Sequence, residues 1–409
     1  MEGLTKRAQG EGTAMEDFIF HNPTKIIFGR GKIAELGREI EPFGKRVLFV
    51  YGQGSIRQNG IYDQVVRSLE GRGIHRVELP GVRSNPVLSR VYEGIDAARR
   101  ERVDVLLAVG GGSVMDTAKA IAAGVPADHD VWEFFLFRKT VERALPVLTV
   151  PTVSASASEM NGAAVITKEE GARKFSARSP LLNPRTSILD PSVLFSLDPA
   201  YSAYSAVDAV THALEGYFNQ TATESTLQDR LVEALIRTIM ESTEVILREP
   251  RNYEARAAMM WSAVLAFNGL TTAGRGRVTL PVHMIEHSLS ALYDLPHGAG
   301  LSILLPAWMS FQSTGDPRKL ARFGREIFGV ENRDDRTAAR RGGRFLKAWF
   351  QMIGAPVTLQ EGGIPEGSVD DIAEHALALA AVWQLKEYTK DVILEVLKRC
   401  TVHFDEERT

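Results

Sequence analysis

Three histidines lie close together in the second half of the chain. His283, His287 and His297 fall within fifteen residues, although the whole sequence of 409 residues has only nine histidines. A fourth, His212, follows Asp208 by four residues. Imidazoles combined with a carboxylate suit Zn²⁺ or Fe²⁺, whereas Ca²⁺ and Mg²⁺ favour oxygen ligands. The residue types therefore predict a divalent metal site.

The spacing of these residues supports the same prediction. Asp208 and His212 are four residues apart, so they share one face of a helix. His283 and His287 have the same spacing, and His297 follows a proline at the expected start of a further helix. Burying such groups without partners costs on the order of several kcal/mol, which disfavours a polar patch without an ion. Spacing alone suggests His283 and His287 as a ligand pair, but it does not decide which histidines bind the metal.

A glycine-rich turn provides the second chemical signal. The run Gly110-Gly-Gly-Ser-Val-Met-Asp116 follows the apolar segment Val103–Val109 and precedes the helical segment Thr117–Ala123. Glycines let the backbone approach a phosphate, and the first N–H groups of a helix point at it. Ser113 and Asp116 also match a capping box, which is the purely structural interpretation of these two side chains.

A second turn of this type, Gly52-Gln-Gly-Ser55, follows the apolar segment Arg46–Tyr51. Ligands of open α/β sheets bind at the carboxyl ends of the strands. Two glycine-rich turns after two apolar segments therefore predict a nucleotide site at that edge of a sheet.

The first half of the chain alternates short apolar runs with amphipathic stretches such as Ile61–Gly71 and Val87–Arg102. This alternation predicts βαβ units and a Rossmann-like parallel sheet. The expected strands are Lys25–Phe28, Arg46–Tyr51, Arg76–Leu79, Val103–Val109, Pro146–Val150, Ala163–Thr167 and Thr186–Leu189.

Beyond Asp198 the pattern indicates helices only. The expected helices are Tyr201–Phe218, Thr226–Arg248, Tyr253–Phe267, Val282–Tyr293, Pro317–Phe328, Arg340–Ile353, Val369–Ala380 and Thr389–Lys398. We therefore expect a disordered polar tail over residues 1–16, an α/β domain over 17–198 and an all-helical domain over 199–409. Arg275-Gly-Arg277 is expected in a solvated loop, and Glu331–Arg341 in a solvated loop or a helix start.

Composition excludes several classes of protein. The length of 409 residues fits two domains, and 44% hydrophobic with 24% charged residues is typical of a soluble globular protein. A net charge of -3 gives no signal for nucleic acid. No apolar run reaches the roughly 18 residues that would span a membrane. The lone Cys400 and the polar N-terminus lead us to expect a cytoplasmic protein.

Taken together, these residues resemble the iron-containing (group III) alcohol dehydrogenase family, most closely its butanol dehydrogenase and NADPH-dependent aldehyde reductase branch. The resemblance runs from about residue 17 to near residue 400. It implies a dehydroquinate synthase-like architecture, in which an α/β domain precedes an all-helical one. The matching stretches are Phe20–Gly29, Gly110–Asp116, Ser154–Asn161, Val207–His212 and His283–Gly298.

The resemblance assigns roles that spacing leaves open. It implies that His287 is a substrate-side residue and a candidate for proton relay. It implies metal ligands at Asp208, His212, His283 and His297. It implies contacts with the cofactor's pyrophosphate and nicotinamide ribose at Gly111, Gly112, Ser113 and Asp116, with further cofactor contacts at Thr152, Ser158 and Lys174.

The activity implied is reversible hydride transfer between NAD(P)H and a small aldehyde or primary alcohol, with Fe²⁺ or Zn²⁺ as the metal. The family pairs edge strands near the N-terminus, so Asp17–Phe28 is a candidate edge for a homodimer. Two departures from the family pattern stand out. Ala157 occupies a turn position where the family has glycine. Gly52 replaces the acidic residue of NAD-specific members, and Ser55 and Arg57 lie nearby, which favours NADP(H) over NAD(H).

Three other classes remain as alternatives. A metal-dependent lyase of the dehydroquinate synthase type shares the architecture and binds NAD, but its anionic substrate calls for a cluster of cations, and only Arg275 and Arg277 are evident. A metallohydrolase needs no dinucleotide site. A non-catalytic nucleotide-binding protein does not need four intact ligand positions.

Overall fold

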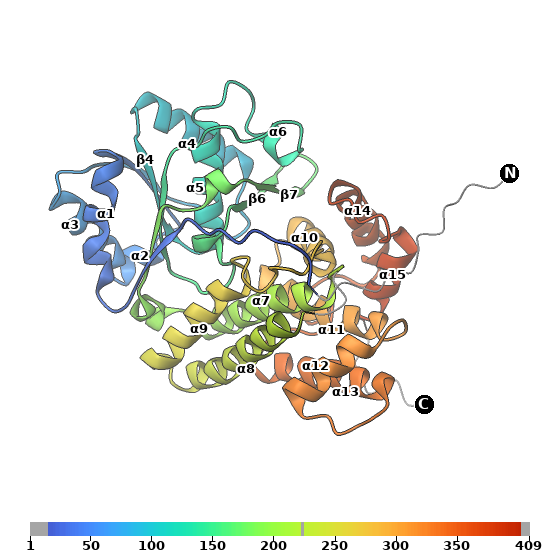
Figure 1. Ribbon diagram of the computed structural model, residues 1–409. Helices are drawn as coiled ribbons and strands as arrows, with labels where there is room; N and C mark the ends of the chain where they lie inside the picture. Colours follow the sequence, from blue (N-terminus) through green and yellow to red (C-terminus); the bar gives the residue numbers. More distant parts are fainter. Residues whose placement is uncertain (1–14, 222–224, 402–409) are drawn as a thin grey trace.

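The computed structural model describes residues 15–221 and 225–401. Figure 1 shows an α/β region packed against a bundle of helices, with the polypeptide passing from the first to the second through α7. In the described part of the chain no helix is long and apolar enough to cross a membrane.

Six parallel strands form the main sheet, in the order β1-β8-β5-β4-β2-β3. Side chains of the central strands β2, β4 and β5 alternate between two buried layers, which is why these segments are largely apolar. In β2, Leu48 and Val50 belong to one core, whereas Val47 and Phe49 belong to the other. The strands are β1 (Lys25–Phe28), β2 (Arg46–Tyr51), β3 (His75–Leu79), β4 (Val105–Gly110), β5 (Val147–Pro151) and β8 (Thr186–Leu189).

Short helices connect these strands and cover both faces of the sheet (Figure 1). The amphipathic pattern is clear in α3, whose residues Ile61, Val65 and Leu69 recur every four positions and are all buried. The α-helices are α1 (Leu36–Ile40), α2 (Ser55–Gln58), α3 (Ile61–Glu70), α4 (Leu88–Arg100), α5 (Gly112–Gly124) and α6 (Trp132–Phe135). The 3-10 turns are η1 (Lys32–Glu35), η2 (Glu41–Phe43), η3 (Ser158–Met160), η4 (Pro180–Leu182) and η5 (Pro191–Ser196).

A separate antiparallel hairpin, β6 (Ala163–Lys168) and β7 (Arg173–Arg178), lies beside the sheet. The sequence predicted β6 but not β7. Strand β7 begins and ends with arginine, and its apolar members Phe175 and Ala177 face the core while Lys174 is also buried. The charged residues therefore mask the apolar alternation of β7, although this strand contributes residues to the cavity described below.

The helical region starts at Asp198, whose side chain accepts a hydrogen bond from Ala200 N, as expected for an Asp-Pro helix start. Each predicted helix is present, and α13 begins within the predicted Glu331–Arg341 segment. The helices are α7 (Pro199–Phe218), α8 (Thr226–Arg248), α9 (Tyr253–Ala266), α10 (Pro281–Tyr293), α11 (His297–Gln312), α12 (Arg318–Phe328), α13 (Asp335–Met352), α14 (Val369–Val382) and α15 (Lys390–Lys398).

The two regions share buried surface. Met260 and Val264 of α9 belong to the same core as Val47 and Phe49 of β2. Strand β7 packs against α10. Residues 1–14 of the predicted tail lie outside the described residues. Glu16, the last residue of that predicted tail, donates its backbone N–H to Gly274 O at 2.9 Å. The described chain therefore contacts the helical region from its first residues onward.

Candidate active site

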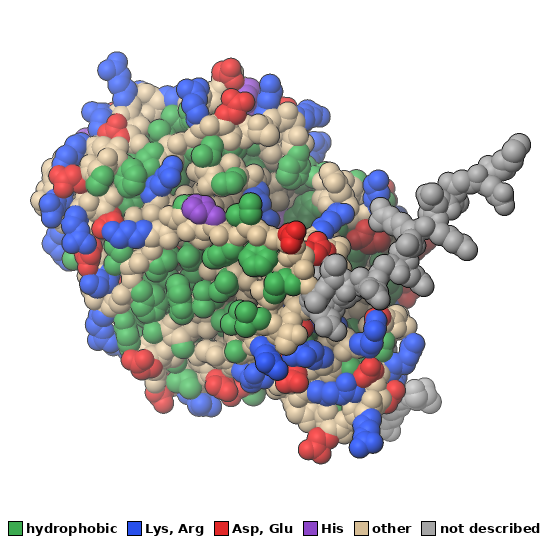
Figure 2. Space-filling model, viewed as in Figure 1, with side chains coloured by type: hydrophobic (Ala, Val, Ile, Leu, Met, Phe, Trp, Pro, Cys, Tyr) green, Lys and Arg blue, Asp and Glu red, His purple; other side chains and the backbone are tan. Residues whose placement is uncertain are grey.

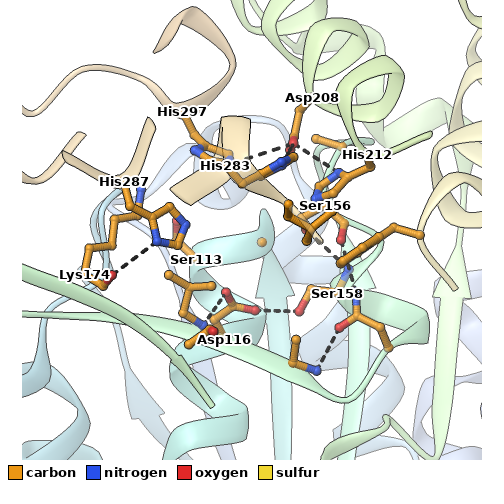
Figure 3. Close-up of a pocket in the computed structure, with 18 of the residues that line it drawn as sticks. Ser113, Asp116, Ser156, Ser158, Lys174, Asp208, His212, His283, His287 and His297 are labelled. Atoms are coloured by element: carbon orange, nitrogen blue, oxygen red, sulfur yellow. Dashed lines mark hydrogen bonds and ion pairs between the residues drawn. The ribbon is translucent and has the colours of Figure 1, made fainter. Parts of the chain in front are cut away.

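A cavity of about 580 Å³ lies between the α/β region and the helices. Figure 3 shows the residues that converge on it. Of the residues singled out in the sequence, those that line it are Gly111, Gly112, Ser113, Asp116, Ser158, Lys174, Asp208, His212, His283, His287 and His297. Gly52, Ser55, Arg57 and Thr152 do not line this cavity.

Helices α7, α10 and α11 bring the metal candidates together (Figure 3). The ligand atoms of Asp208, His283 and His297 all lie within 4.8 Å of one another. Asp208 Oδ1 stands 3.6 Å from His283 Nε2 and 3.8 Å from His297 Nε2. His212 Nδ1 is 3.2 Å from Asp208 Oδ1, and the His212 ring stacks on His283 with centroids 4.3 Å apart. We call Asp208, His212, His283 and His297 the metal cluster.

The metal cluster fits a divalent cation. Atoms bound to one tetrahedral zinc ion at about 2.0–2.1 Å stand roughly 3.3 Å apart. This is close to the distances from Asp208 Oδ1 to the nearest nitrogens of the three histidines. Asp208 Oδ1, His212 Nδ1 and His283 Nε2 are buried and have no hydrogen-bond partner among the described residues. Buried polar atoms that converge without partners carry a large desolvation cost, which a cation at their centre offsets.

Two glutamates that the sequence analysis missed stand behind the imidazoles. The Nδ1 atoms of His283 and His297 pair with Glu215 and Glu286. Glu215 also accepts hydrogen bonds from the backbone N–H groups of Val282 at 2.6 Å and His283 at 3.3 Å. A carboxylate on Nδ1 fixes the tautomer and leaves Nε2 free to bind metal.

A sequence signal for these glutamates existed. Glu215 and Asp208 are the two charged residues of α7, and Glu286 is the acid of the apolar helix α10. Acids on otherwise buried helices need partners. Glu215 lies three residues after His212, and Glu286 lies three residues after His283.

The same contacts set the charge of the imidazoles. Burial opposes a positive charge on His283, but Glu215 and Asp208 raise its pKa to about 10, so a metal ion at Nε2 would replace a proton there. Burial lowers the pKa of His212 to about 3, so this ring is neutral. For Asp208, burial alone would raise the pKa, but the surrounding imidazoles lower it, so the carboxylate is ionised. The metal cluster thus presents an anionic oxygen where a cation is expected.

His287 lies beside the metal cluster on α10. It is buried, its Nδ1 is 3.2 Å from Lys174 O, and its ring meets Trp383 edge-on at 5.2 Å. Burial, and then the nearby Lys174, lower the pKa of His287 well below its usual value. A neutral ring that donates from Nδ1 to the carbonyl keeps an unprotonated Nε2.

The glycine-rich turn joins β4 to α5 at the opposite wall. Gly111 is the N-cap of α5, so the alternative interpretation of Ser113 and Asp116 as a capping box does not hold. Ser113 lies within the first turn, and its hydroxyl instead bonds to Ser84 O. A Cβ on Gly112 would stand 2.6 Å from Ser156 Oγ, so a side chain at this position would have to displace Ser156.

Asp116 is held from the side of the hairpin. Its carboxylate accepts hydrogen bonds from Ser158 Oγ at 2.6 Å and from Val165 N at 3.0 Å. The buried Lys119 donates to Ser158 Oγ at 2.8 Å and to Asn161 O at 2.8 Å. Burial lowers the pKa of Lys119 to about 8. The sequence analysis did not identify Lys119. Its hydrogen bonds hold Ser158 and Asn161 in place, and these residues form the polar floor of the cavity.

The turn that differs from the family pattern is strained. Ala157 is fully buried and has φ 50° and ψ 20°, in the left-handed region that favours glycine. A Cβ in this conformation costs about 1–2 kcal/mol. Ala157 therefore introduces backbone strain at the turn position where the family has glycine.

Arg57 lies beyond the carboxyl end of β2, and its guanidinium is already engaged by other side chains. Its guanidinium donates to Glu78 at 2.8 Å and to Tyr51 Oη at 2.6 Å, and it lies 3.9 Å from the Tyr62 ring centroid. Gly52 follows β2 directly, and a Cβ there would meet only Val82 O at 3.6 Å.

The two arginines near residue 276 do not form the solvated pair that was expected. Arg275 is fully buried and donates to Asp229 at 2.9 Å and to Thr271 O at 2.7 Å. Arg277 lines the cavity and donates to Gln384 O at 3.0 Å. The solvated-loop prediction is therefore wrong for Arg275, because an interior carboxylate pairs with it.

Family models match both regions of the chain: "Iron-containing alcohol dehydrogenase" over residues 23–191 and "Fe-containing alcohol dehydrogenase family, C-terminal" over residues 202–401. A probable NADH-dependent butanol dehydrogenase of Bacillus subtilis is 39% identical over 94% of this chain and 99% of its own length. The NADPH-dependent aldehyde reductase YqhD of Escherichia coli is 33% identical over 94% and 98%.

Solved structures that resemble this chain include members of the same group of enzymes. The crystal structure of an NADH-dependent butanol dehydrogenase A from Thermotoga maritima has a TM-score of 0.92 and 44% identity, covering 95% of this chain and 100% of that one. The lyase alternative weighed from the sequence is overturned, because these relatives are named as dehydrogenases and reductases. The chain belongs to the iron-containing alcohol dehydrogenase family.

Proposed function

We propose that this protein is a metal-dependent alcohol dehydrogenase and aldehyde reductase, which transfers a hydride between NAD(P)H and a small aldehyde or primary alcohol. One observation carries the proposal. The unpartnered atoms of the metal cluster and the glycine-rich turn Gly111–Ser113 border the same cavity. A hydrolase needs no dinucleotide site there, and a nucleotide-binding protein without catalysis needs no converging metal ligands.

Asp208, His212, His283 and His297 would hold Fe²⁺ or Zn²⁺. When bound, such an ion polarises an alcohol or carbonyl oxygen, and the nicotinamide supplies or accepts the hydride. Glu215 and Glu286 hold the His283 and His297 rings in the tautomer that presents Nε2. The protein would therefore fix the position of the ion, and with it the point where the substrate oxygen binds, before the substrate arrives.

The opposite wall orients the cofactor. The first N–H groups of α5 have no acceptor within the helix and face the cavity at Gly112 and Ser113, where they would bind the pyrophosphate. Asp116, Ser158 and Lys174 would contact the ribose and nicotinamide. Because Lys119 and Val165 hold the polar floor in place, little rearrangement is needed on binding.

His287 would move the proton. Its Nδ1–H is committed to Lys174 O, so Nε2 is the atom that accepts a proton from an alcohol or returns it to the product. The lowered pKa of this buried ring makes it a poor proton store. We therefore assign it the role of a relay that passes the proton on to water or to a ribose hydroxyl.

For the cofactor we propose NADP(H) in preference to NAD(H). No carboxylate follows β2 at Gly52, and Arg57 lies near the end of that strand. Glu78 neutralises part of the charge of Arg57, so we expect a preference of about tenfold or less. The relatives named above include both NADH- and NADPH-dependent enzymes. Arg57→Gln should lower the ratio of kcat/KM for NADPH over NADH, and an unchanged ratio would contradict this role.

We also propose a homodimer through the edge of the sheet. Strand β1 is an edge strand, and Phe18, Ile19 and Phe20 before it are exposed. Phe28 of β1 packs against Trp261 of α9, and both remain more than one-third exposed. Figure 2 shows hydrophobic side chains gathered on this face, over α9 and its neighbours. Light scattering of the wild type and of Ile19→Asp would test this assembly.

The proposed activity is tested by NADPH oxidation against a panel of aldehydes, with metal-free protein and after adding Fe²⁺ or Zn²⁺. We expect turnover of short aldehydes only with metal. Absence of turnover with every aldehyde and either ion would contradict the proposal.

A further inference from the structure

Arg178, the last residue of β7, carries a positive charge into the cavity without a counter-charge. Its side chain borders the cavity and is solvent-accessible. Within the described residues its side chain makes no hydrogen bond or ion pair; it lies over the Phe267 ring, whose centroid is 5.8 Å from the Arg178 Cζ. Enclosure by the walls of the cavity lowers the pKa of Arg178, yet arginine stays protonated in proteins.

The other cations of the cavity wall are already engaged. Lys174 donates to Asn85 Oδ1 at 3.2 Å and lies 3.9 Å from Glu286. Arg277 donates to Gln384 O. The two acids of the wall, Asp116 and Asp208, are committed to the Ser158–Val165 contacts and to the metal cluster. Arg178 is therefore the cation of this wall that remains available to a ligand.

Strand β7 separates two functions along the cavity. At its start, Lys174 contacts Asn85, and the neighbouring Ser84 accepts the hydrogen bond of Ser113, so this end lies beside the phosphate turn. Arg178 is four residues further along, or about 13 Å in a strand. Figure 3 shows Lys174 and His212 on opposite sides of the labelled residues.

The far end of β7 lies next to the metal cluster. Phe267, which meets Arg178, also stacks on His212 with centroids 4.2 Å apart. The Arg178 Cζ is therefore at most roughly 10 Å from the centre of the His212 ring. This span leaves room for a carboxylate on the guanidinium, a short carbon chain and an aldehyde oxygen at the metal cluster. Arg178 therefore belongs to the substrate end of the cavity and not to the pyrophosphate end.

We propose that Arg178 binds a carboxylate at the far end of the substrate, so that the protein acts on short aldehydes and alcohols with a terminal carboxylate. A guanidinium matches a carboxylate with two parallel hydrogen bonds. A phosphate dianion would call for a second free cation, but Lys174 is assigned to the cofactor and Arg277 donates to Gln384 O. This inference rests on the proposed dehydrogenase function and specifies its substrate class.

The chemistry at the reacting end is unchanged. The hydride passes from the nicotinamide to the aldehyde carbon, a proton is added to the oxygen, and the cofactor is oxidised while the aldehyde is reduced to an alcohol. No bond to the carboxylate forms or breaks. Its role is to fix the distance between the aldehyde and the metal cluster, which raises kcat/KM by orienting the substrate.

The test compares butanal with 4-oxobutanoate, two four-carbon aldehydes that differ in the terminal carboxylate. We expect the metal-loaded wild type to have a kcat/KM at least about tenfold higher for 4-oxobutanoate. Arg178→Gln should lower the ratio of the two kcat/KM values by about 10- to 100-fold, as loss of a charge-assisted hydrogen bond predicts. Its kcat/KM for butanal should stay within about threefold.

Two further variants make the result specific. Arg178→Lys keeps the charge without the paired hydrogen bonds and should recover part of the ratio. Arg173→Gln removes the same charge from the start of the same strand, where the side chain is exposed and does not line the cavity, and should leave the ratio unchanged.

Each other outcome overturns the inference. An unchanged ratio in Arg178→Gln, or equal losses with both aldehydes, would show that Arg178 does not recognise the carboxylate. A raised KM for NADPH with both aldehydes would assign Arg178 to the cofactor. Turnover of butanal without preference for 4-oxobutanoate in the wild type would leave the dehydrogenase function standing and reject the substrate class. Turnover of neither would remove the proposed function and this inference together.

Discussion

The two walls of the cavity are built from different kinds of groups. On the α/β side, the β4–α5 turn offers backbone N–H groups, and Gly112 keeps the space in front of them open. On the helical side, the side chains of Asp208, His283 and His297 converge. A backbone site depends on which side chains are absent, whereas a side-chain site depends on the partners that hold its ligands. Substitutions should therefore act on the two walls by different rules.

The partners behind the ligands should give the largest effect. Glu286→Gln or Glu215→Gln removes the carboxylate that orients a metal-cluster histidine and makes its Nε2 more basic. We expect metal affinity to fall about 10- to 100-fold, measured by competition with a chelator. Glu254→Gln, on the exposed face of α9, is the control and should have no effect. Unchanged affinity in both buried variants would remove the distinction between the walls.

On the backbone wall, adding atoms should matter more than removing them. Gly112→Val places a side chain against Ser156 and in front of the α5 N–H groups. We expect NADPH affinity, followed by cofactor fluorescence, to fall about 10- to 100-fold while metal content is unchanged. Ser113→Ala loses only the bond to Ser84 and should cost no more than about fivefold. A larger effect from Ser113→Ala than from Gly112→Val would reverse this account.

Glu159, in the turn between the walls, should make stability depend on pH. Both of its carboxylate oxygens are buried without a hydrogen-bond partner among the described residues, and burial raises its pKa to about 7 from 4.5. Between these two pH values the folded state binds more protons than the unfolded state, so the free energy of unfolding falls as pH rises.

Glu159→Gln should remove this dependence and stabilise the protein at pH 8 by on the order of 2 kcal/mol. Urea denaturation at pH 5 and pH 8 measures it. Parallel changes in the wild type and the variant would show that the Glu159 carboxylate is not buried without a partner.

The smallest effect is expected at Ala157. Glycine at this position relieves the left-handed strain, so Ala157→Gly should raise the free energy of unfolding by about 0.5–1 kcal/mol. Thermal denaturation checks the sign. Destabilisation would mean that the methyl group's packing outweighs its strain.

The sequence revealed the elements well where a single physical signal dominates. Strands β2 and β8 and helix α8 have the predicted bounds, because apolar runs buried on both faces and long amphipathic helices have clear patterns; the edge strand β1 also has the predicted bounds. Strand β7 was missed because its cavity face carries Lys174 and Arg178, which hide the alternation.

The site was predicted less completely than the fold. Residue types and spacing pointed to a metal site but left its ligand set open, and Glu215 and Glu286 are recognised only once the helices bring them behind the rings. Ser113 and Asp116 matched a capping pattern, yet the helix starts two residues earlier than that pattern needs. Arg178 has no local pattern at all, since its exposure to the cavity depends on how β7 packs against α10 and Phe267.

The most direct test of the central claim is the metal content of the wild type and of Asp208→Asn after loading with Fe²⁺ or Zn²⁺, with NADPH binding measured on the same samples. We predict one ion per chain in the wild type, a loss of nearly all metal in Asp208→Asn and intact NADPH binding in both. A full equivalent of metal in Asp208→Asn, or aldehyde reduction by it at the wild-type rate, would contradict the account.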